Sequence, residues 1–326
     1  LKKIQREVSA RGQTMMFWGD IILKYPKLIS QLPKNAVALN WGYEANHPFE
    51  KEVAQFAKAK IPFYVCPGTS TWQTIVGKHD NGLANLRAAA KAGKKFGAIG
   101  YLNTDWGDGG HPQPLAVSWP MFIAGAALAW NSKNFDESKL IPVLGRDIFE
   151  NSKVAEAAFN LGFAHKKLGV NESNETPLGT VIAAPKPEDH ELFCRNGLKW
   201  FAKIPAKKIH ATLKEIGKQI SVLKSLGRRH AVPPEKEILR RELELAARMA
   251  AQSCQFMLWQ KAVAAGENSK AKKLAQIRIR ELRRLQKDFD SYWPLRNKAT
   301  PKHCSPFLQW RMDDFRRRLK SKKFHF

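Results

Sequence analysis

Four short segments in the first third of the chain place tryptophan beside glycine and polar side chains. They are residues 18–20, 41–44, 67–72 and 103–111. Indole rings can lie against the apolar faces of sugar rings, and carboxylates accept hydrogen bonds from sugar hydroxyls. These segments therefore predict a carbohydrate-binding site, with another polar small molecule as the alternative ligand.

Ten residues in these segments are the candidates for substrate binding. They are Trp18, Asp20, Trp41, Tyr43, Glu44, Trp72, Asp105, Trp106, Asp108 and His111. A single tryptophan is more simply explained by core packing, but its recurrence in all four segments favours a binding site. Asp105 and Asp108 have a structural alternative, because Asp often caps helices or binds loop amides. Glu44 could instead pair with a neighbouring lysine.

Each segment lies at the end of a short apolar run, and these runs are the elements that must position the site. Residues 15–19, 36–42, 61–68 and 97–102 predict buried strands, and residues 49–60 and 83–94 predict helices between them. Strands that alternate with helices form parallel sheets. The polar segments then fall at the carboxyl ends of the strands, where α/β folds place their active sites.

The pattern changes after about residue 131, where only helical periodicity remains. The spacing of Ile209, Leu213, Ile216, Ile220 and Leu223 predicts one amphipathic helix. Residues 201–326 contain 31 basic and 11 acidic side chains, so most of the formal charge of +26 lies in this part. We therefore predict an α/β domain over residues 1–150 and a basic, all-α domain over residues 151–326.

Several classes of protein are excluded or disfavoured. The most apolar stretch, residues 121–130, is too short to span a membrane, which predicts a soluble protein of undetermined compartment: periplasmic, extracellular or cytoplasmic. Cys66, Cys194, Cys254 and Cys304 are too far apart for a zinc ribbon, and the pair His190 and Cys194 lacks further metal ligands. Glycine-rich phosphate-binding motifs are absent.

The four segments with their strands resemble one known family. Their sequences are FWGD at 17–20, ALNWGYEANHPF at 38–49, PFYVCPGTSTWQTI at 62–75 and AIGYLNTDWGDGGH at 98–111. In order and spacing they resemble the second half of the barrel of glycoside hydrolase family 20, the β-N-acetylhexosaminidases. The resemblance covers about residues 15–130 and implies strands 5 to 8 of a (β/α)₈ TIM barrel. From the residues alone, a small open α/β sheet is the alternative.

The resemblance also implies a mechanism and roles for individual residues. In family 20 the acetamido oxygen of the substrate attacks the anomeric carbon, an Asp orients the acetamido group, and an adjacent Glu protonates the leaving oxygen. This Asp-Glu pair belongs to strand four, so we expect it upstream of Leu1 and expect this chain alone to be inactive. Trp18, Trp41 and Trp106 would line the sugar pocket, Asp108 would bind distal hydroxyls, and Asp20 would match a strand-five carboxylate.

One feature departs from the family pattern. Many members have a tyrosine in the strand-seven loop, which binds the acetamido oxygen, whereas this chain has Thr69, Ser70, Thr71 and Trp72 there. Tyr43 or Tyr101 would then take that place, or the geometry differs.

The sequence thus predicts a β-N-acetylhexosaminidase-like hydrolase that needs no metal or organic cofactor. The alternative is a non-catalytic protein that binds carbohydrate in the pocket or an anionic polymer on the basic helices. The latter would use Arg228–Arg229, Arg240–Arg241, Arg283–Arg284 and Arg316 to Arg318. Nucleic acid is an improbable partner, because no recognised nucleic-acid-binding motif is present.

Overall fold

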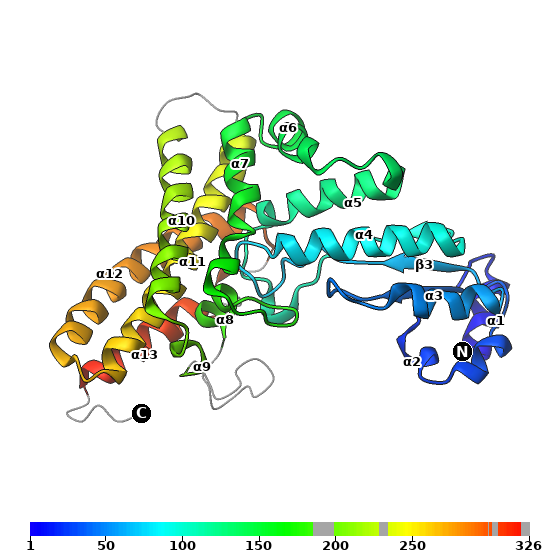
Figure 1. Ribbon diagram of the computed structural model, residues 1–326, viewed down its shortest axis with the longest axis horizontal. Coiled ribbons are helices and arrows are strands. Elements are labelled where there is room, and N and C mark those ends of the chain that lie inside the picture. The colour runs from blue at the N-terminus through cyan, green and yellow to red at the C-terminus, as the bar shows by residue number, and fades with distance from the viewer. Residues whose placement is uncertain (185–198, 228–233, 299, 302–305, 321–326) are drawn as a thin grey trace. The chain divides into compact units, whose positions relative to one another are not determined.

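The computed structural model describes residues 1–184, 199–227, 234–298, 300–301 and 306–320 (Figure 1). His190, Cys194, Arg228, Arg229 and Cys304 lie outside the described residues. The chain packs as two compact units. The first comprises Leu1–Ser70, His79–Asp105 and Met121–Leu140, and the second comprises Thr71–Lys78, Trp106–Pro120 and Ile141–Phe326.

The first unit contains a four-stranded parallel sheet. Its strands, β1 (Met16–Trp18), β2 (Val37–Trp41), β3 (Phe63–Cys66) and β4 (Gly100–Tyr101), pair in the order β1-β2-β3-β4. Phe17 lies opposite Ala38, and Ala38 lies opposite Phe63. The predicted parallel sheet is confirmed, and all four polar segments follow the carboxyl ends of its strands.

Helices α3 (Phe49–Lys58) and α4 (His79–Phe96) pack against this sheet and run beside β3 (Figure 1). In α3 the buried side chains of Phe49, Val53 and Phe56 recur at helical spacing and form one apolar face. Glu50 and Glu52 in its first turn, together with Lys58 in its last, complement the helix dipole. The core lies between this face and the strands.

The remaining elements of the first unit are short, except for the helix α5 (Trp119–Asn131), whose first two residues belong to the second unit. The short elements are α1 (Lys2–Ala10), α2 (Asp20–Leu23), η1 (Pro26–Gln31), η4 (Ser132–Asn134) and η5 (Glu137–Lys139). Helix α5 is almost wholly apolar, but its last turn is not buried on all sides, since Trp130 is 91% exposed.

The second unit is built of helices, as predicted for the C-terminal part. They are α7 (Ser152–Leu161), α8 (Pro177–Ala183), α9 (Lys199–Ala202), α10 (Ala206–Leu226), α11 (Pro234–Ala264), α12 (Asn268–Tyr292) and α13 (Phe307–Lys320). Shorter turns are η2 (Asp108–Gly110), η3 (Leu115–Ser118), η6 (Leu144–Ile148), η7 (Ala164–Leu168) and η8 (Trp293–Leu295). The helix α6 (Leu140–Val143) begins at the junction of the units.

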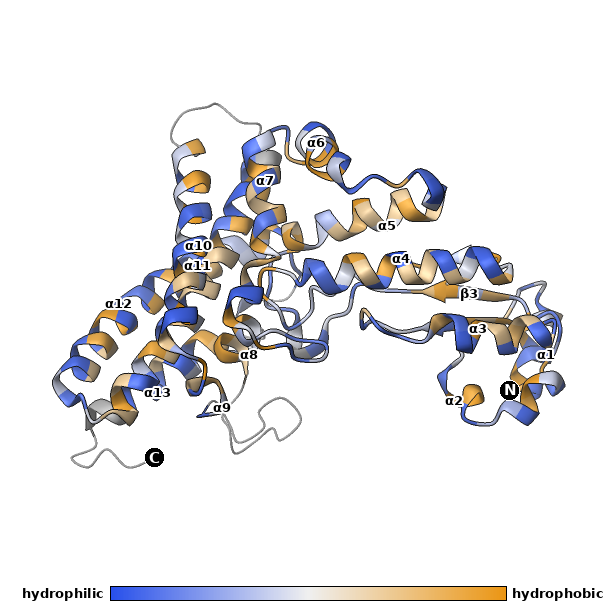
Figure 2. Ribbon diagram, in the orientation of Figure 1, coloured by the Kyte–Doolittle hydropathy of each residue, from blue (hydrophilic) through white to orange (hydrophobic). Residues whose placement is uncertain are grey.

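Hydrophobic and hydrophilic residues alternate around α10, α11 and α12, as expected for helices that share a core (Figure 2). The predicted helix around Ile216 is confirmed as α10. Its buried line, however, includes Thr212 and Gln219 in place of Leu213 and Ile220, which are half-buried. The two polar side chains are accommodated because Thr212 donates to the carbonyl of Lys208 and Gln219 donates to Glu215.

Candidate functional site

The carboxyl ends of β1 and β2 carry an exposed aromatic surface. Trp18 is 40% exposed and Trp41 is 36% exposed, which is unusual for such large side chains. The rings of Trp41 and Tyr43 stack with their centroids 5.1 Å apart and their planes 25° apart. The indole Nε1 of Trp41 donates to Oδ1 of Asp20 at 3.3 Å. Two rings and a carboxylate are therefore held together at adjacent strand ends.

Two buried asparagines of α4 hold the backbone that follows β2. Asn85 is fully buried, and its Nδ2 donates at 2.9 Å to the carbonyls of Gly42 and Glu44. Asn81 donates from Nδ2 to the carbonyl of Tyr43 at 2.6 Å, and its Oδ1 accepts from the amide of Ala45 at 2.8 Å. The backbone beneath Tyr43 and Glu44 is thus fixed, while both side chains are half-buried.

The same asparagines reach the segment after β3. Oδ1 of Asn85 accepts from the amide of Gly68 at 3.1 Å, and Nδ2 of Asn81 donates to Oγ of Ser70 at 2.9 Å. Sequence reasoning missed both residues. The available signal was the pair of amide side chains at i and i+4 on an otherwise apolar helix face, which a buried helix tolerates only where they find partners.

Asp105 has a structural contact in the first unit. Its Oδ1 accepts a hydrogen bond from Oγ1 of Thr69 at 2.8 Å, and the amide of Thr69 donates to the carbonyl of Thr104 at 2.9 Å. These bonds join the ends of the segments after β3 and β4. Asp105 therefore has a structural role in joining these two segments, in line with the alternative to substrate binding that its sequence position allowed.

Residues 70–75 have a strained backbone. Ser70, Gln73 and Ile75 have φ values of 56°, 56° and 68°, in the left-handed region that a β-branched residue such as Ile strongly disfavours. Such conformations cost about 1–3 kcal/mol each and persist only where neighbouring contacts enforce them. Strain of this kind concentrates at functional sites.

Contacts inside the second unit enforce the conformation of residues 71–78. Oγ1 of Thr71 hydrogen-bonds Oγ of Ser118 at 3.0 Å. The amide and Oγ1 of Thr176, at the start of α8, donate to the carbonyls of Gln73 and Thr74 at 3.4 Å and 3.2 Å. Trp72 is only 2% exposed. The site role predicted for Trp72 therefore stays a prediction for a side chain that is enclosed in this structure.

The segment after β4 places three predicted site residues in the second unit. Trp106 and His111 are half-buried and Asp108 is exposed. Asp108 opens the turn η2, and His111 closes it with a left-handed φ of 48°. Trp18, Asp20, Trp41, Tyr43, Glu44 and Asp105 belong to the first unit, whereas Trp72, Trp106, Asp108 and His111 belong to the second.

A buried carboxylate holds the end of this segment. Oε2 of Glu242, in α11, accepts from the amide of Ala116 in η3 at 2.8 Å, and its Oε1 lies 2.9 Å from Nε of Arg296. The Glu242 side chain is 0% exposed. Burial raises the pKa of Glu242, although Arg296 and the Ala116 amide act in the opposite direction. Sequence spacing gives no signal for this contact, because the partners are 126 residues apart.

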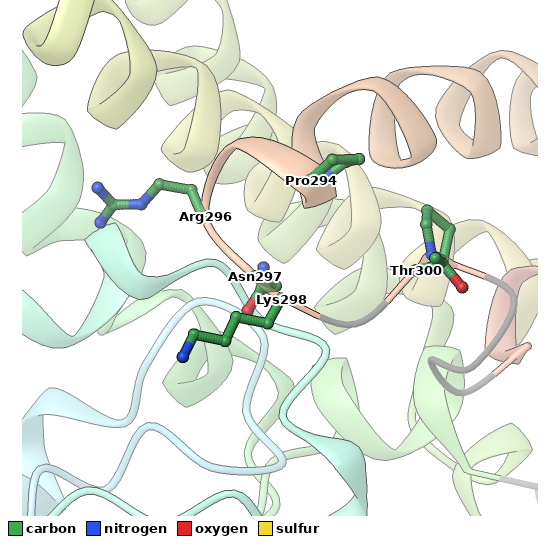
Figure 3. Close-up of a pocket in the computed structure, with 6 residues that line it drawn as sticks. Pro294, Arg296, Asn297, Lys298 and Thr300 are labelled. Carbon is green, nitrogen blue, oxygen red and sulfur yellow. The ribbon is translucent and has the colours of Figure 1, made fainter.

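Arg296 also borders a shallow cavity of about 500 Å³ in the second unit (Figure 3). Its other lining residues are Pro294, Asn297, Lys298, Thr300 and Pro301. Figure 3 shows the Arg296 side chain extending away from Thr300. Because the Arg296 guanidinium is paired with Glu242, Lys298 is the remaining cation of this cavity.

Many arginines of the basic helices are committed to intramolecular ion pairs. Arg240 pairs with Glu237 and Glu244 and donates to the buried carbonyl of Leu223. Arg316 and Arg317 pair with Asp313 and Asp314. These ion pairs neutralise part of the positive charge that the alternative function, anion binding by the basic helices, would need.

Among the residues that the structure describes, no group of three or more His, Cys, Asp or Glu side chains is arranged to hold a metal ion. None of the described helices combines the length and apolarity needed to cross a membrane.

Comparison with known proteins shows a likeness to solved structures. No family model matches the sequence, and no curated protein matches it. The fold is similar to that of a solved glycoside hydrolase, a GH138 enzyme targeting pectin rhamnogalacturonan II, with a TM-score of 0.51 and 11% sequence identity. The match covers 96% of this chain and 56% of the other, so the chain spans about half the length of that enzyme. The chain therefore has a fold of the kind found in glycoside hydrolases.

Proposed function

We propose that the chain forms the carbohydrate-binding half of a glycoside hydrolase of the β-N-acetylhexosaminidase type, family 20. The observation that carries this proposal is the exposure of Trp18 and Trp41 at the ends of β1 and β2, with Tyr43 stacked on Trp41 and Asp20 hydrogen-bonded to it. The likeness to a glycoside hydrolase fold supports the broader class. In this proposal the four parallel strands form half of a (β/α)₈ barrel.

The stacked rings of Trp41 and Tyr43 supply an apolar face for a sugar ring. Asp20 both orients the Trp41 indole and presents a carboxylate to sugar hydroxyls. Glu44 would add a second acceptor, while the binding roles of Trp106, Asp108 and His111, which belong to the second unit, stay predictions. The buried asparagines under residues 42–45 preorganise the backbone, which lowers the entropy cost of binding.

The proposed reaction is substrate-assisted and retaining. The acetamido oxygen of the substrate attacks the anomeric carbon, and a general acid protonates the leaving oxygen. The orienting Asp and the acid Glu belong to a part of the barrel outside this chain in the proposal, so we assign no catalytic residue here. Release of a terminal N-acetylhexosamine therefore requires the completed barrel.

Titration calorimetry of the chain with N-acetylglucosamine and glucose tests the proposal. We expect weak, saturable binding of N-acetylglucosamine that exceeds glucose binding by about tenfold, and no hydrolysis of a nitrophenyl N-acetylglucosaminide. Trp41→Ala should weaken binding by about tenfold or more, because the stacking surface is lost. Trp130→Ala is the matched control, since Trp130 is 91% exposed and lies away from the strand ends.

Absence of saturable binding, or equal losses in both variants, would contradict the proposed site. The alternative function, a non-catalytic carbohydrate-binding protein, is favoured by one observation. The four strand-end segments contain no adjacent Asp-Glu pair. Equal affinity for glucose and N-acetylglucosamine would support that alternative, because a hexosaminidase site must recognise the acetamido group.

A further inference from the structure

Another cavity, lined by none of the residues of the strand-end segments, lies within the first unit. It has a volume of about 500 Å³, which falls in the range of small-ligand sites. We call it the α4 cavity. Its lining residues are Arg87, Lys91, Lys94, Lys95, Leu128, Ser132, Lys133 and Phe135.

Four of the cations come from one face of α4. Arg87, Lys91, Lys94 and Lys95 follow the i, i+4, i+7, i+8 spacing of a single helical stripe. Like charges three or four residues apart destabilise a helix. The helix dipole favours the two lysines in the last turn, but its effect falls off before Lys91 and Arg87. The stability of α4 therefore does not account for the four positive charges along this stripe.

Nearby carboxylates neutralise only part of this charge. Oε2 of Glu50 lies 2.5 Å from Nζ of Lys95, and Oε1 lies 3.9 Å from Nζ of Lys91. Glu137 pairs with Arg87 at 2.6 Å. Within the described chain no ion pair involves Lys94 or Lys133, and both are exposed. Five cations against two carboxylates leave a positive cavity.

The cavity also has an apolar wall. Leu128 is 4% exposed, and the half-buried ring of Phe135 lies 5.1 Å from the Arg87 guanidinium carbon. An aromatic wall beside cations suits a ligand that combines ring faces with anionic groups. Glu50 and Glu137, which pair with Lys95 and Arg87, have further lone pairs that can accept hydrogen bonds from sugar hydroxyls.

We propose that the α4 cavity binds an acidic oligosaccharide, a short chain of sugars bearing carboxylates. Lys94 and Lys133 bind the sugar carboxylates, and Phe135 contacts a ring face. The site is independent of the strand-end residues and of the reaction proposed for them. It would hold the chain on a uronate-containing polymer.

Calorimetry with tetragalacturonate and with its fully methyl-esterified form tests this proposal. The ester keeps every ring but removes the negative charges, so it separates carboxylate recognition from stacking. We expect the free acid to bind at least about tenfold more tightly than the ester, with affinity falling as salt is raised.

The double variant Lys94→Glu/Lys133→Glu should weaken tetragalacturonate binding by about tenfold or more. The matched control is Lys51→Glu/Lys58→Glu, which makes the same charge change on exposed positions of α3 outside the cavity. Equal loss in both variants, or equal binding of the ester, would overturn the proposal. Duplex DNA or a sulfated oligosaccharide that bound more tightly, with the same variant dependence, would overturn the carboxylate assignment.

Discussion

The segments after β2 and β3 have similar compositions but opposite roles in the structure. Each follows a parallel strand, contains one tryptophan, and is held by asparagines of α4. Trp41, the last residue of β2, is 36% exposed, whereas Trp72, after β3, is 2% exposed. The backbone of the β2 segment is fixed, while the Trp41 ring is exposed. The β3 segment has left-handed φ values and a hydrogen bond from Thr71 to Ser118, and its tryptophan is buried.

This difference shows that a tryptophan in a strand-end motif is not by itself evidence of ligand contact. Trp41 and Trp72 differ in the exposed fraction of the side chain. Trp41 donates to the Asp20 carboxylate and keeps an exposed ring, whereas the ring of Trp72 is buried. We therefore expect substitutions at the two positions to affect different properties.

The largest effect is expected for Trp72→Ala. Removal of a buried aromatic side chain leaves a cavity and costs about 3–5 kcal/mol of unfolding free energy. Urea unfolding monitored by circular dichroism would measure the loss. A change below about 1 kcal/mol would show that Trp72 is not part of the packed core.

Gly179→Ala should destabilise the same loop from its partner helix. A Cβ at Gly179 in α8 would lie 1.9 Å from the carbonyl oxygen of Gln73, a backbone atom that cannot move aside cheaply. We expect a loss of about 3 kcal/mol. Gly217→Ala is the control, because nothing lies within 4 Å of that position in α10 and alanine should stabilise the helix by up to about 1 kcal/mol. Equal melting temperatures for the two variants would contradict this packing.

Glu242→Gln probes the segment after β4. In the variant the amide oxygen can still accept from Ala116, but the amide nitrogen is a donor that faces the Arg296 donor. This unpaired buried donor should cost about 1–3 kcal/mol at neutral pH. Because burial raises the pKa of Glu242, the folded state binds a proton more readily than the unfolded state. The wild-type chain should therefore gain stability relative to the variant as pH falls from 7 towards the ordinary value of 4.5. A pH-independent difference in urea midpoints would contradict this assignment.

The smallest effect on stability is expected for Trp41→Ala. Its ring is more than a third exposed, so truncation should cost at most about 1 kcal/mol, as for most surface substitutions. The variant should therefore remain folded, so that its weaker binding of N-acetylglucosamine reports on the site and not on unfolding. A thermal melt that matches the wild type within a few degrees would establish that separation.

The sequence was sufficient to predict the parallel sheet and the positions of its polar ends, because short apolar runs and intervening helices are local patterns. It also predicted α10, although Thr212 and Gln219 occupy buried places that hydrophobicity alone gave to Leu213 and Ile220. The enclosure of Trp72 was not predictable from the same motif, since Thr176, which holds its loop, lies about a hundred residues away.

Other parts of the candidate site depend on contacts that no local pattern encodes. Glu242 reaches Ala116 across 126 residues, and Asn85 reaches the segments after both β2 and β3. The positive α4 cavity was equally hidden, because three of its lining residues, Ser132, Lys133 and Phe135, follow α5 and not α4. Charge counts along the chain directed attention to the C-terminal helices instead.

The most direct test of the contrast is to record the indole N–H signals of the chain by ¹⁵N NMR during titration with N-acetylglucosamine. We predict that the Trp41 indole signal shifts, because its Nε1 bonds Asp20 within the proposed site, while the signals of buried Trp72 and remote Trp130 stay unchanged. A shift of Trp72 without Trp41, or no shift at saturating sugar, would contradict the account.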